Sequence, residues 1–516
     1  MKDEHKYVNK ITKATAILFI GMFIGRFFGY LTRLIIARFF GAEAIGLFSM
    51  AGAIIGIATT IALLGIPVGV SRYISFYLGK KDEGRVRGTI LSGLKITLPT
   101  GIIAGMVSFL FSSSISHFYF NEPELQPLLE LFSFAIPFSV LLTIILHSYR
   151  GFQNMRYKVI IEDILKPLST LLFIIVFFFW GYGIYGAVAA YTAGYIISAV
   201  VSIYFLSKLI PFFGNKVKPI SINRELLTFS WPVILSGYIW MLIQWTDVMM
   251  LGFYWDATQV GLYNVAATTA GLLLIMADSI IYMFMPVISE LFAKGKKLEI
   301  IKSHNIILKW AFLINVAFSM LMIFFPDNVL NVLFGQEFVA ASSVLVILSL
   351  GYIISTPSLL SGSILTALAK TKLGLKIVLI GGCINVLLNF LLIPIPELKM
   401  NGAAIATLAS FIVMSYLKLY YANKYMKTGY MHVSFIKSII SGSISILIFY
   451  SILKFLYSSP PWYILGGVFP LFLILYGFLF LLFKGIDKDD ILMIKNLEKK
   501  MGIELKIVRK IAKKFL

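Results

Sequence analysis

Long apolar runs constrain the fold of this chain more than any other feature of its sequence. Stretches such as STLLFIIVFFFW (169–180) and FPLFLILYGFLFLLF (469–483) contain no charged residue. A helix rises about 1.5 Å per residue, so it needs about 20 apolar residues to cross the hydrocarbon core of a bilayer. Runs of this kind recur along the whole chain and therefore predict a multi-pass membrane protein.

The runs predict fourteen membrane-spanning helices and an all-α fold. Only 13% of the residues are charged, against about a quarter in soluble domains, and a membrane β-barrel would show short alternating segments instead. The predicted helices cover residues 13–37, 45–67, 88–114, 128–149, 159–180, 184–207, 226–250, 260–289, 303–325, 339–369, 373–394, 402–422, 433–456 and 462–483.

Basic residues indicate how these helices are oriented. The chain carries a formal net charge of +21, which in a soluble protein would suggest a nucleic-acid partner. Here most Lys and Arg residues fall in alternate inter-helix segments, whereas the intervening segments carry acids such as Glu122, Asp256 and Asp327. Because basic loops stay in the cytoplasm, we expect a cell-membrane protein with both termini inside. We also expect contact with anionic membrane lipids and no nucleic acid.

The chain also repeats itself. Gly46-Leu47-Phe48 matches Gly261-Leu262-Tyr263, and Gly186-Ala187 matches Gly402-Ala403 after almost the same interval of about 215 residues. One repeat contains six predicted helices, and this even number makes the two copies face the same way. In many transporters, parallel repeats of this kind form two lobes around a central cavity and work by alternating access.

The repeat divides the chain into five parts. They are an N-terminal lobe (1–207), a cytoplasmic linker (208–224), a C-terminal lobe (225–424), two further helices (425–484) and a basic tail (485–516). Apolar residues recur at helical spacing among the lysines of the tail. This pattern predicts an amphipathic helix on the inner membrane surface, with a partner-binding tail as the alternative.

Charged residues inside the spans are the candidate functional residues. Arg26 and Arg33 lie seven residues apart in the first span and therefore share one helix face. A stripe of Gly21, Gly25 and Gly29 beside them would let another helix approach closely. Guanidinium groups match phosphate oxygens, so we expect Arg26 to attract an anionic, phosphate-type group. For Arg33 the same role and contact with outer headgroups both stay open.

Further charged residues extend this prediction. Arg72 and Lys95 lie toward the inner ends of their spans, where they would prolong a basic path for the substrate or contact headgroups. Asp278 would either bind a coupling proton or sodium ion or balance an arginine. Asp247 could take the same roles, but its position near the outer end of its span beside Trp245 also fits a plain interfacial residue.

Two other groups of charged residues have simpler interpretations. Arg38 is expected to reach the outer headgroups. Glu162, Asp163 and Lys166 cluster at the inner end of the fifth span, which predicts a structural ion pair.

Other classes of protein fit the sequence less well. The chain has one cysteine, Cys383, so it can form neither an internal disulfide nor a cysteine-based metal site. Its five histidines are scattered, and no Gly-rich phosphate-binding loop ending in Lys-Ser or Lys-Thr is present. We therefore expect no enzymatic activity, no cofactor and no ATP-driven step.

Three segments carry a resemblance to a known family. They are GRFFGYLTRLIIARFFGAEAIGLFSMAGAI (25–54), LLGIPVGVSRYISFYLGKKDEGRVR (63–87) and TDVMMLGFYWDATQVGLYNVAATTA (246–270). With this layout of twelve core spans plus two, the whole chain resembles the polysaccharide transporters of the MATE/MOP superfamily, the Wzx-type flippases. The resemblance implies two six-helix bundles in a V around a central cleft. It also implies movement of a polyprenyl-diphosphate-linked oligosaccharide from the inner to the outer leaflet.

Two other functions stay open. A multidrug exporter of the same superfamily would be expected to carry an acid in the cavity of its first lobe, whereas the first span here carries arginines. A flippase for peptidoglycan precursor would share the cationic cavity, so the charge pattern does not distinguish it from an oligosaccharide flippase.

Overall fold

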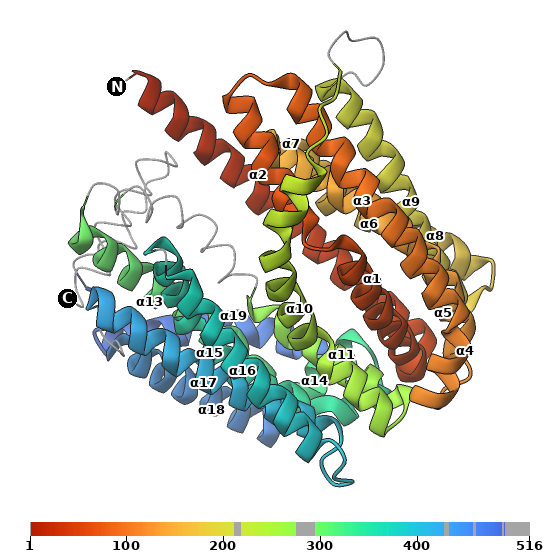
Figure 1. Ribbon diagram of the computed structural model, residues 1–516. Coiled ribbons are helices and arrows are strands. Elements are labelled where there is room, and N and C mark those ends of the chain that lie inside the picture. The colour runs from red at the N-terminus through yellow and green to blue at the C-terminus, as the bar shows by residue number, and fades with distance from the viewer. Residues whose placement is uncertain are drawn as a thin grey trace. The chain divides into compact units, whose positions relative to one another are not determined.

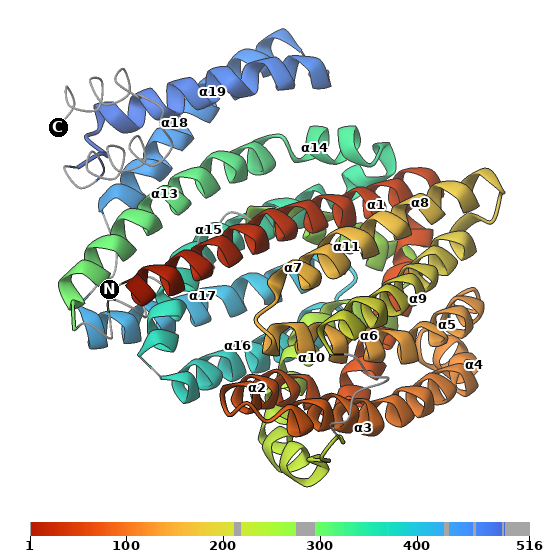
Figure 2. The same ribbon diagram turned by 90° about the horizontal axis from the view of Figure 1, so that it is seen from above.

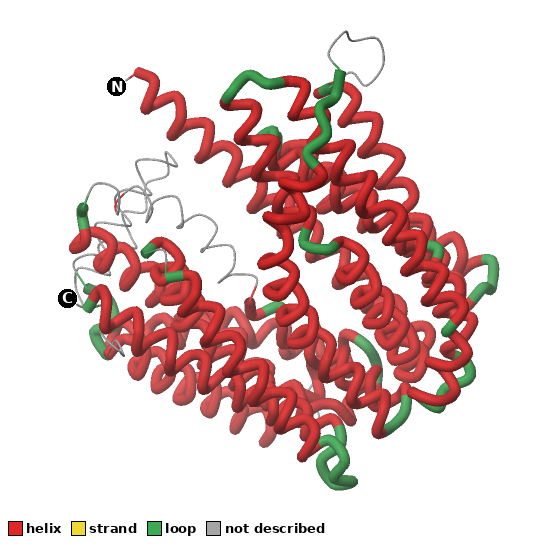
Figure 3. The backbone as a smooth tube through the Cα atoms, viewed as in Figure 1, coloured by secondary structure: helices red, strands yellow, loops and turns green. Residues whose placement is uncertain are grey.

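The computed structural model describes residues 2–210, 218–274, 291, 295–368, 370–427, 433–457, 461–487 and 490. These residues form helices joined by turns and loops, and no strand occurs among them (Figures 1 and 3). The predicted all-α fold is therefore confirmed. Asp278 and all of the predicted tail except residues 485–487 and 490 lie outside the described residues.

The longer helices follow one another along the whole chain. They are α1 (Lys2–Leu63), α2 (Ile66–Gly79), α3 (Glu83–Leu110), α5 (Leu125–Ser133), α6 (Ala135–Gly151), α8 (Lys166–Phe179), α9 (Gly183–Leu209), α10 (Asn223–Tyr254), α11 (Ala257–Gly271), α13 (Lys297–Phe324), α14 (Pro326–Leu333), α15 (Ser342–Ala367), α16 (Thr371–Leu392), α17 (Met400–Met426), α18 (Val433–Leu456) and α19 (Trp462–Leu482). The shorter ones are α4 (Ser112–Ser114), α7 (Met155–Lys158), the π-helices η1 (Ile115–Tyr119) and η2 (Val159–Leu165), and the 3-10 helix η3 (Gln336–Ala341).

The predicted apolar runs fall on these helices. Within the described residues, nine helices are long and apolar enough to cross a membrane, or ten if the bent pair α5 and α6 counts as one span. A multi-pass membrane protein is therefore confirmed, while the number of fourteen spans stays a prediction. One reason for the difference is that the first two predicted runs form the single helix α1, which is broken only at Gly41 (φ 86°, ψ 180°).

Helix α2 has no counterpart in the sequence prediction, which ended a span at residue 67. Leu64 (φ 48°) and Gly65 (φ 64°) both adopt the left-handed conformation and turn the chain after α1. Pro67 then stands in the first turn of α2, where its missing N–H costs no hydrogen bond. Two residues with left-handed backbone conformation, followed by a proline, thus start a new helix inside an otherwise apolar stretch.

The chain folds as two compact units. Unit 1 comprises Met1–Val265 and Val386–Ala403, and unit 2 comprises Ala266–Asn385 and Ala404–Leu516. In unit 1, α3, α6 and α9 pack side by side, and α1 runs alongside α8 (Figure 2). Its core includes Ile74 of α2 and Tyr149 of α6, whose hydroxyl donates a hydrogen bond to the Ser202 carbonyl of α9 at 2.5 Å.

The repeated glycines of the sequence touch one another in unit 1. A Cβ atom on Gly46 of α1 would lie 1.7 Å from the carbonyl oxygen of Ala257, and one on Gly261 of α11 would lie 1.9 Å from that of Ala42. Each glycine therefore faces the carbonyl four residues before the other. The matching Gly-Leu-aromatic segments thus form a reciprocal backbone contact, which only glycine permits at this separation.

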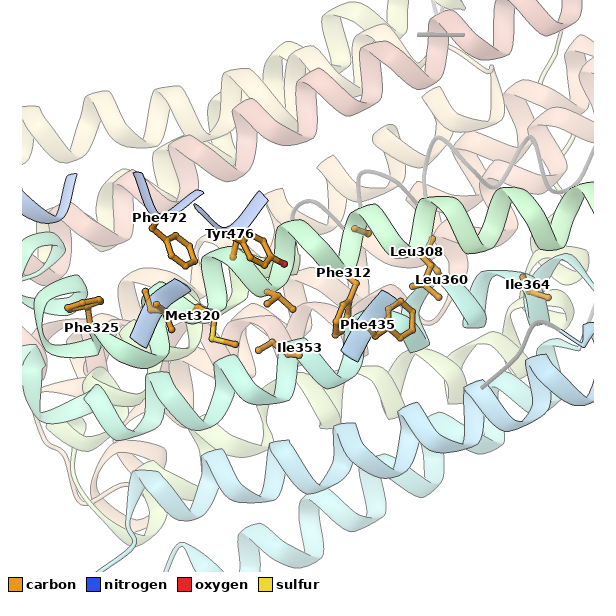
Figure 4. Packing of buried hydrophobic residues seen from close by; sticks show 14 of the residues in the cluster. Leu308, Phe312, Met320, Phe325, Ile353, Leu360, Ile364, Phe435, Phe472 and Tyr476 are labelled. Atoms are coloured by element: carbon orange, nitrogen blue, oxygen red, sulfur yellow. The ribbon is translucent and has the colours of Figure 1, made fainter. Parts of the chain in front are cut away.

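Unit 2 has its own apolar core between α13, α15, α18 and α19 (Figure 4). The rings of Phe312 and Phe435 pack 4.6 Å apart, and the rings of Phe472 and Tyr476 are stacked. The Tyr476 hydroxyl donates to the Leu313 carbonyl at 3.0 Å, so α19 is attached to α13 by both apolar and polar contacts.

A buried ion cluster in unit 2 joins α13 to the segment that follows α19. The Lys309 ammonium, only 3% exposed, contacts Asp487 at 2.8 Å and also contacts the fully buried Asp490. The Trp310 indole donates to the second carboxylate oxygen of Asp490 at 2.9 Å. A lysine inside a membrane helix needs such partners, and here they come from a segment that the sequence analysis assigned to the tail.

Candidate functional site

A cavity of about 320 Å³ lies in unit 1 between α1, η2, α8 and α9. Its charged lining comprises Arg26 of α1, the acid pair Glu162 and Asp163 of η2, and Lys166 at the start of α8. Thr170 and Tyr191 add hydroxyl groups from α8 and α9. The first predicted substrate-binding residue therefore lines a polar opening together with both signs of charge.

The glycine stripe of α1 brings the acid pair close to Arg26. A Cβ atom on Gly25 would lie 2.8 Å from the Asp163 carbonyl oxygen, and one on Gly21 would lie 2.2 Å from the Val159 side chain. Glycine at these positions therefore lets the η2 backbone pack directly on α1. Gly29 has nothing within 4 Å of the position of its missing Cβ and lines the open part of the cavity.

Proline explains why the acids lie on a π-helix. Pro167 has no N–H, so it cannot donate to the carbonyl of Asp163 four residues earlier. The Lys166 N–H instead bonds to the Ile161 carbonyl, five residues back. Single turns of this kind are frequent at functional sites. Here the widened turn presents two consecutive carboxylates to the cavity.

Lys158 neutralises part of the acid pair. Its ammonium lies 3.0 Å from Glu162 and 2.9 Å from Asp163, and its side chain is only 8% exposed. The Lys166 ammonium lies 4.4 Å from the centre of the Tyr195 ring and interacts electrostatically with Glu162. The cavity lining thus combines two cations, Arg26 and Lys166, with two anions, and Lys158 pairs with both anions.

Arg33 lies next to the cavity rather than in its lining. Its Nη1 atom donates to the Asn264 side chain of α11 at 3.3 Å, and its guanidinium group also interacts with Tyr191, which lines the cavity. Arg33 therefore reaches the cavity that Arg26 lines by way of Tyr191. Neither Tyr191 nor Lys166 was singled out as a ligand from the sequence, because Tyr191 is uncharged and Lys166 was assigned to a structural ion pair with Glu162 and Asp163.

The structure does not bring the other predicted basic residues to this cavity. The Arg72 guanidinium lies over the rings of Phe229, at 4.4 Å, and Tyr73, at 5.7 Å, beside a separate surface pocket between α2 and α10. Lys95 is exposed on α3 and is not part of the cavity lining. Their predicted role in substrate binding therefore stays a prediction.

Asp247 belongs to a polar network inside unit 1. Its carboxylate accepts hydrogen bonds from the Tyr263 hydroxyl of α11 and from the Asn389 amide of α16, the latter at 2.6 Å. Tyr263 is the last residue of the repeated Gly-Leu-aromatic segment. The sequence pointed to Asp247, but its partners lie 16 and 142 positions away and are visible only in the fold.

The fold that holds these sites is that of known membrane transporters. The solved structure of the lipid II flippase MurJ in an inward closed conformation superimposes with a TM-score of 0.70, covers 92% of this chain and 100% of its own, and is 16% identical. The sequence profile described as polysaccharide biosynthesis protein matches residues 11–292, and the MatE profile matches residues 232–391. Because the first match covers more than half of the chain, this protein belongs to the polysaccharide biosynthesis protein family.

Two archaeal relatives add to this assignment. An uncharacterized membrane protein of Methanocaldococcus jannaschii is 25% identical over 461 residues, which cover 86% of this chain and 89% of the relative. A protein of Haloferax volcanii named "probable low-salt glycan biosynthesis flippase" is 26% identical over 211 residues, which cover 40% of this chain and 44% of the relative.

Proposed function

We propose that this protein is a flippase that moves a polyprenyl-diphosphate-linked oligosaccharide or polysaccharide repeat unit across the cytoplasmic membrane. The family, the name of the Haloferax relative and the transporter fold support this function. The charge pattern of the loops supports cytoplasmic N- and C-termini. The transported repeat unit would serve the synthesis of surface polysaccharide or glycan, and the protein would carry out no catalytic step.

The cationic cavity is the observation that carries the proposal. Arg26 and Lys166 line one polar opening inside a membrane-embedded unit, and Lys158 contacts the two acids of its lining. Permanent cations are costly in a membrane and mark a functional path. A guanidinium group bonds two phosphate oxygens at once. Arg26 and Lys166 would therefore hold the diphosphate, with Arg33 adjacent and with Arg72 and Lys95 along the cytoplasmic approach.

Asp247 is the described residue best suited to couple transport to an ion. Its carboxylate has two hydrogen-bond donors around it, and a carboxylate in this setting can exchange a proton or a sodium ion. Asp278 remains a second candidate from the sequence. Binding of a coupling ion to Asp247 would drive the alternating access that parallel repeats permit.

Drug export is the second candidate, and one observation favours it. A cation exporter would carry an acid in its first-lobe cavity, and Glu162 and Asp163 do line the cavity. Both acids contact Lys158, however, so the pair offers less negative charge to a cationic drug than two isolated carboxylates would. A peptidoglycan-precursor flippase would use the same cations and would differ from the proposed oligosaccharide flippase only in its substrate.

Reconstituted transport tests this proposal. Wild-type protein in proteoliposomes should move a defined lipid-linked oligosaccharide, and Arg26→Ala should abolish this movement. Arg38→Ala is the matched control, because Arg38 is an exposed arginine of the same helix outside the cavity lining. Equal transport by all three proteins would remove Arg26 from the mechanism. Export of a cationic dye without movement of the oligosaccharide would assign drug export instead, and selective movement of peptidoglycan precursor would assign the third function.

A further inference from the structure

The proposed anion site already contains two anions of its own. Glu162 and Asp163 follow one another on η2, both line the cavity, and both lie within 3.0 Å of the Lys158 ammonium. Glu162 also interacts electrostatically with Lys166. The cations that would bind a diphosphate are therefore shared with carboxylates that are part of the chain.

A diphosphate and this acid pair cannot occupy the same cations without repulsion. Like charges brought together in a site of low dielectric constant oppose each other strongly. An arriving diphosphate must therefore separate the carboxylates from their cations or bind against their charge. In both cases the acids weaken the binding of the diphosphate. A site that only had to bind the diphosphate tightly would contain cations alone.

We propose that Glu162 and Asp163 are intramolecular competitors of the anionic substrate and set its release. The diphosphate bound by Arg26 and Lys166 takes the place of Glu162 at Lys166, and the return of Glu162 to Lys166 expels it, while Asp163 beside them repels it. A transporter needs such weakening, because a substrate held too tightly at the midpoint of the path does not leave. This inference rests on the proposed function and deepens it by assigning two residues to substrate release.

Local structure fits this role. The acids lie on the π-helix η2 just before Pro167, whose missing N–H removes the ordinary helical hydrogen bond to the Asp163 carbonyl. Gly25 lets the same turn pack against α1 beside Arg26. A purely structural ion pair would need one carboxylate for Lys158, and this turn supplies two that both face the cavity.

Binding of inorganic diphosphate to the purified full-length chain tests the inference. The variants are Glu162→Gln and Asp163→Asn, each made singly so that one carboxylate still neutralises Lys158. We expect each variant to bind diphosphate about tenfold more tightly than the wild type and to transport lipid-linked oligosaccharide more slowly. Glu299→Gln is the control. It removes the same charge from an exposed ion pair with Lys296 and should change neither property.

The outcomes separate this inference from the proposed function. Unchanged or weaker diphosphate binding in both variants, with normal binding by the wild type, would overturn the role of the acids alone. Weaker transport with unchanged diphosphate binding would show that the carboxylates hold the sugar instead, and would also overturn it. If the wild type binds no diphosphate and moves no oligosaccharide, the proposed function itself fails. Adding Arg26→Ala to Glu162→Gln should remove the gain in affinity.

Discussion

The contact between Gly46 and Gly261 gives the sharpest test of how the two repeats pack. Replacing Gly46 by alanine adds one methyl group, whose carbon would lie 1.7 Å from the Ala257 carbonyl oxygen. Ordinary van der Waals contact begins at 3.4 Å, so α1 and α11 must move apart by roughly half of the normal contact distance. Ala42 and Val260 beside the contact are fully buried and would lose packing as the helices separate.

Overpacking of this kind costs about 1–3 kcal/mol, and occasionally more. We therefore expect Gly46→Ala to lower the midpoint of thermal unfolding of the purified protein in detergent. Gly52→Ala is the control in the same helix, because nothing lies within 4 Å of its added methyl group. That variant should be neutral, or stabilised by up to about 1 kcal/mol from the higher helix propensity of alanine.

The reciprocal geometry makes a second, stricter prediction. Gly261→Ala places its methyl group 1.9 Å from the Ala42 carbonyl oxygen and should cost about as much as Gly46→Ala. A single separation of the helices makes room for both methyl groups, so the double variant should lose clearly less than the sum of the two single losses. Fully additive losses, or a Gly46→Ala protein as stable as the wild type, would refute the contact.

Three further predictions concern charged residues. Lys309→Met should destabilise the protein by about 3–5 kcal/mol, because it leaves Asp490 buried without its cation, and adding Asp490→Asn should restore part of this loss in thermal unfolding. Burial alone would raise the pKa of Asp487, but its hydrogen bond to Lys309 and the positive charge of Lys309 outweigh this and hold the pKa below its usual value. Burial raises the pKa of Asp490, so Asp490 takes up a proton first on acidification. The stabilisation from Asp487 is then present above about pH 4 and lost as the pH falls through its lowered pKa. In Lys309→Met, Asp487 loses the cation that lowers its pKa, and protonation relieves the unpaired buried charge of Asp490. Unfolding midpoints of Lys309→Met should therefore fall less than those of the wild type as the pH is lowered, and identical pH profiles would contradict this. Asp247→Asn should leave diphosphate binding unchanged but make oligosaccharide transport independent of proton and sodium gradients, and transport that still follows a gradient would exclude Asp247 from coupling.

Local sequence patterns were sufficient to predict most of the architecture. Continuous apolar runs predicted the helices because a membrane span must satisfy its own backbone hydrogen bonds. Gly21 and Gly25 predicted a close helix contact, which η2 makes. The gap between the predicted spans 13–37 and 45–67 contains the break at Gly41, whereas the new helix after Gly65 was not foreseen, because the apolar stretch continues through that turn.

Predictions about the candidate site were less complete. Arg26 stood out because a charge inside an apolar run is visible in the sequence. Glu162, Asp163 and Lys166 were visible too, but their position near the end of a span favoured a plain ion pair. Only the packing of η2 on α1 shows that they line the same cavity as Arg26.

The sequence by itself determined that this chain crosses a membrane many times, that it contains a repeat, and that Arg26 lies within a span. Hydrophobicity and charge act residue by residue, so these properties can be read locally. The tertiary structure alone decided which charges meet. Lys309 donates a hydrogen bond to Asp490, almost two hundred residues away in the sequence, and Asp247 accepts one from Asn389 on another helix. Such partners depend on how helices distant in sequence pack together, and no local pattern records that packing.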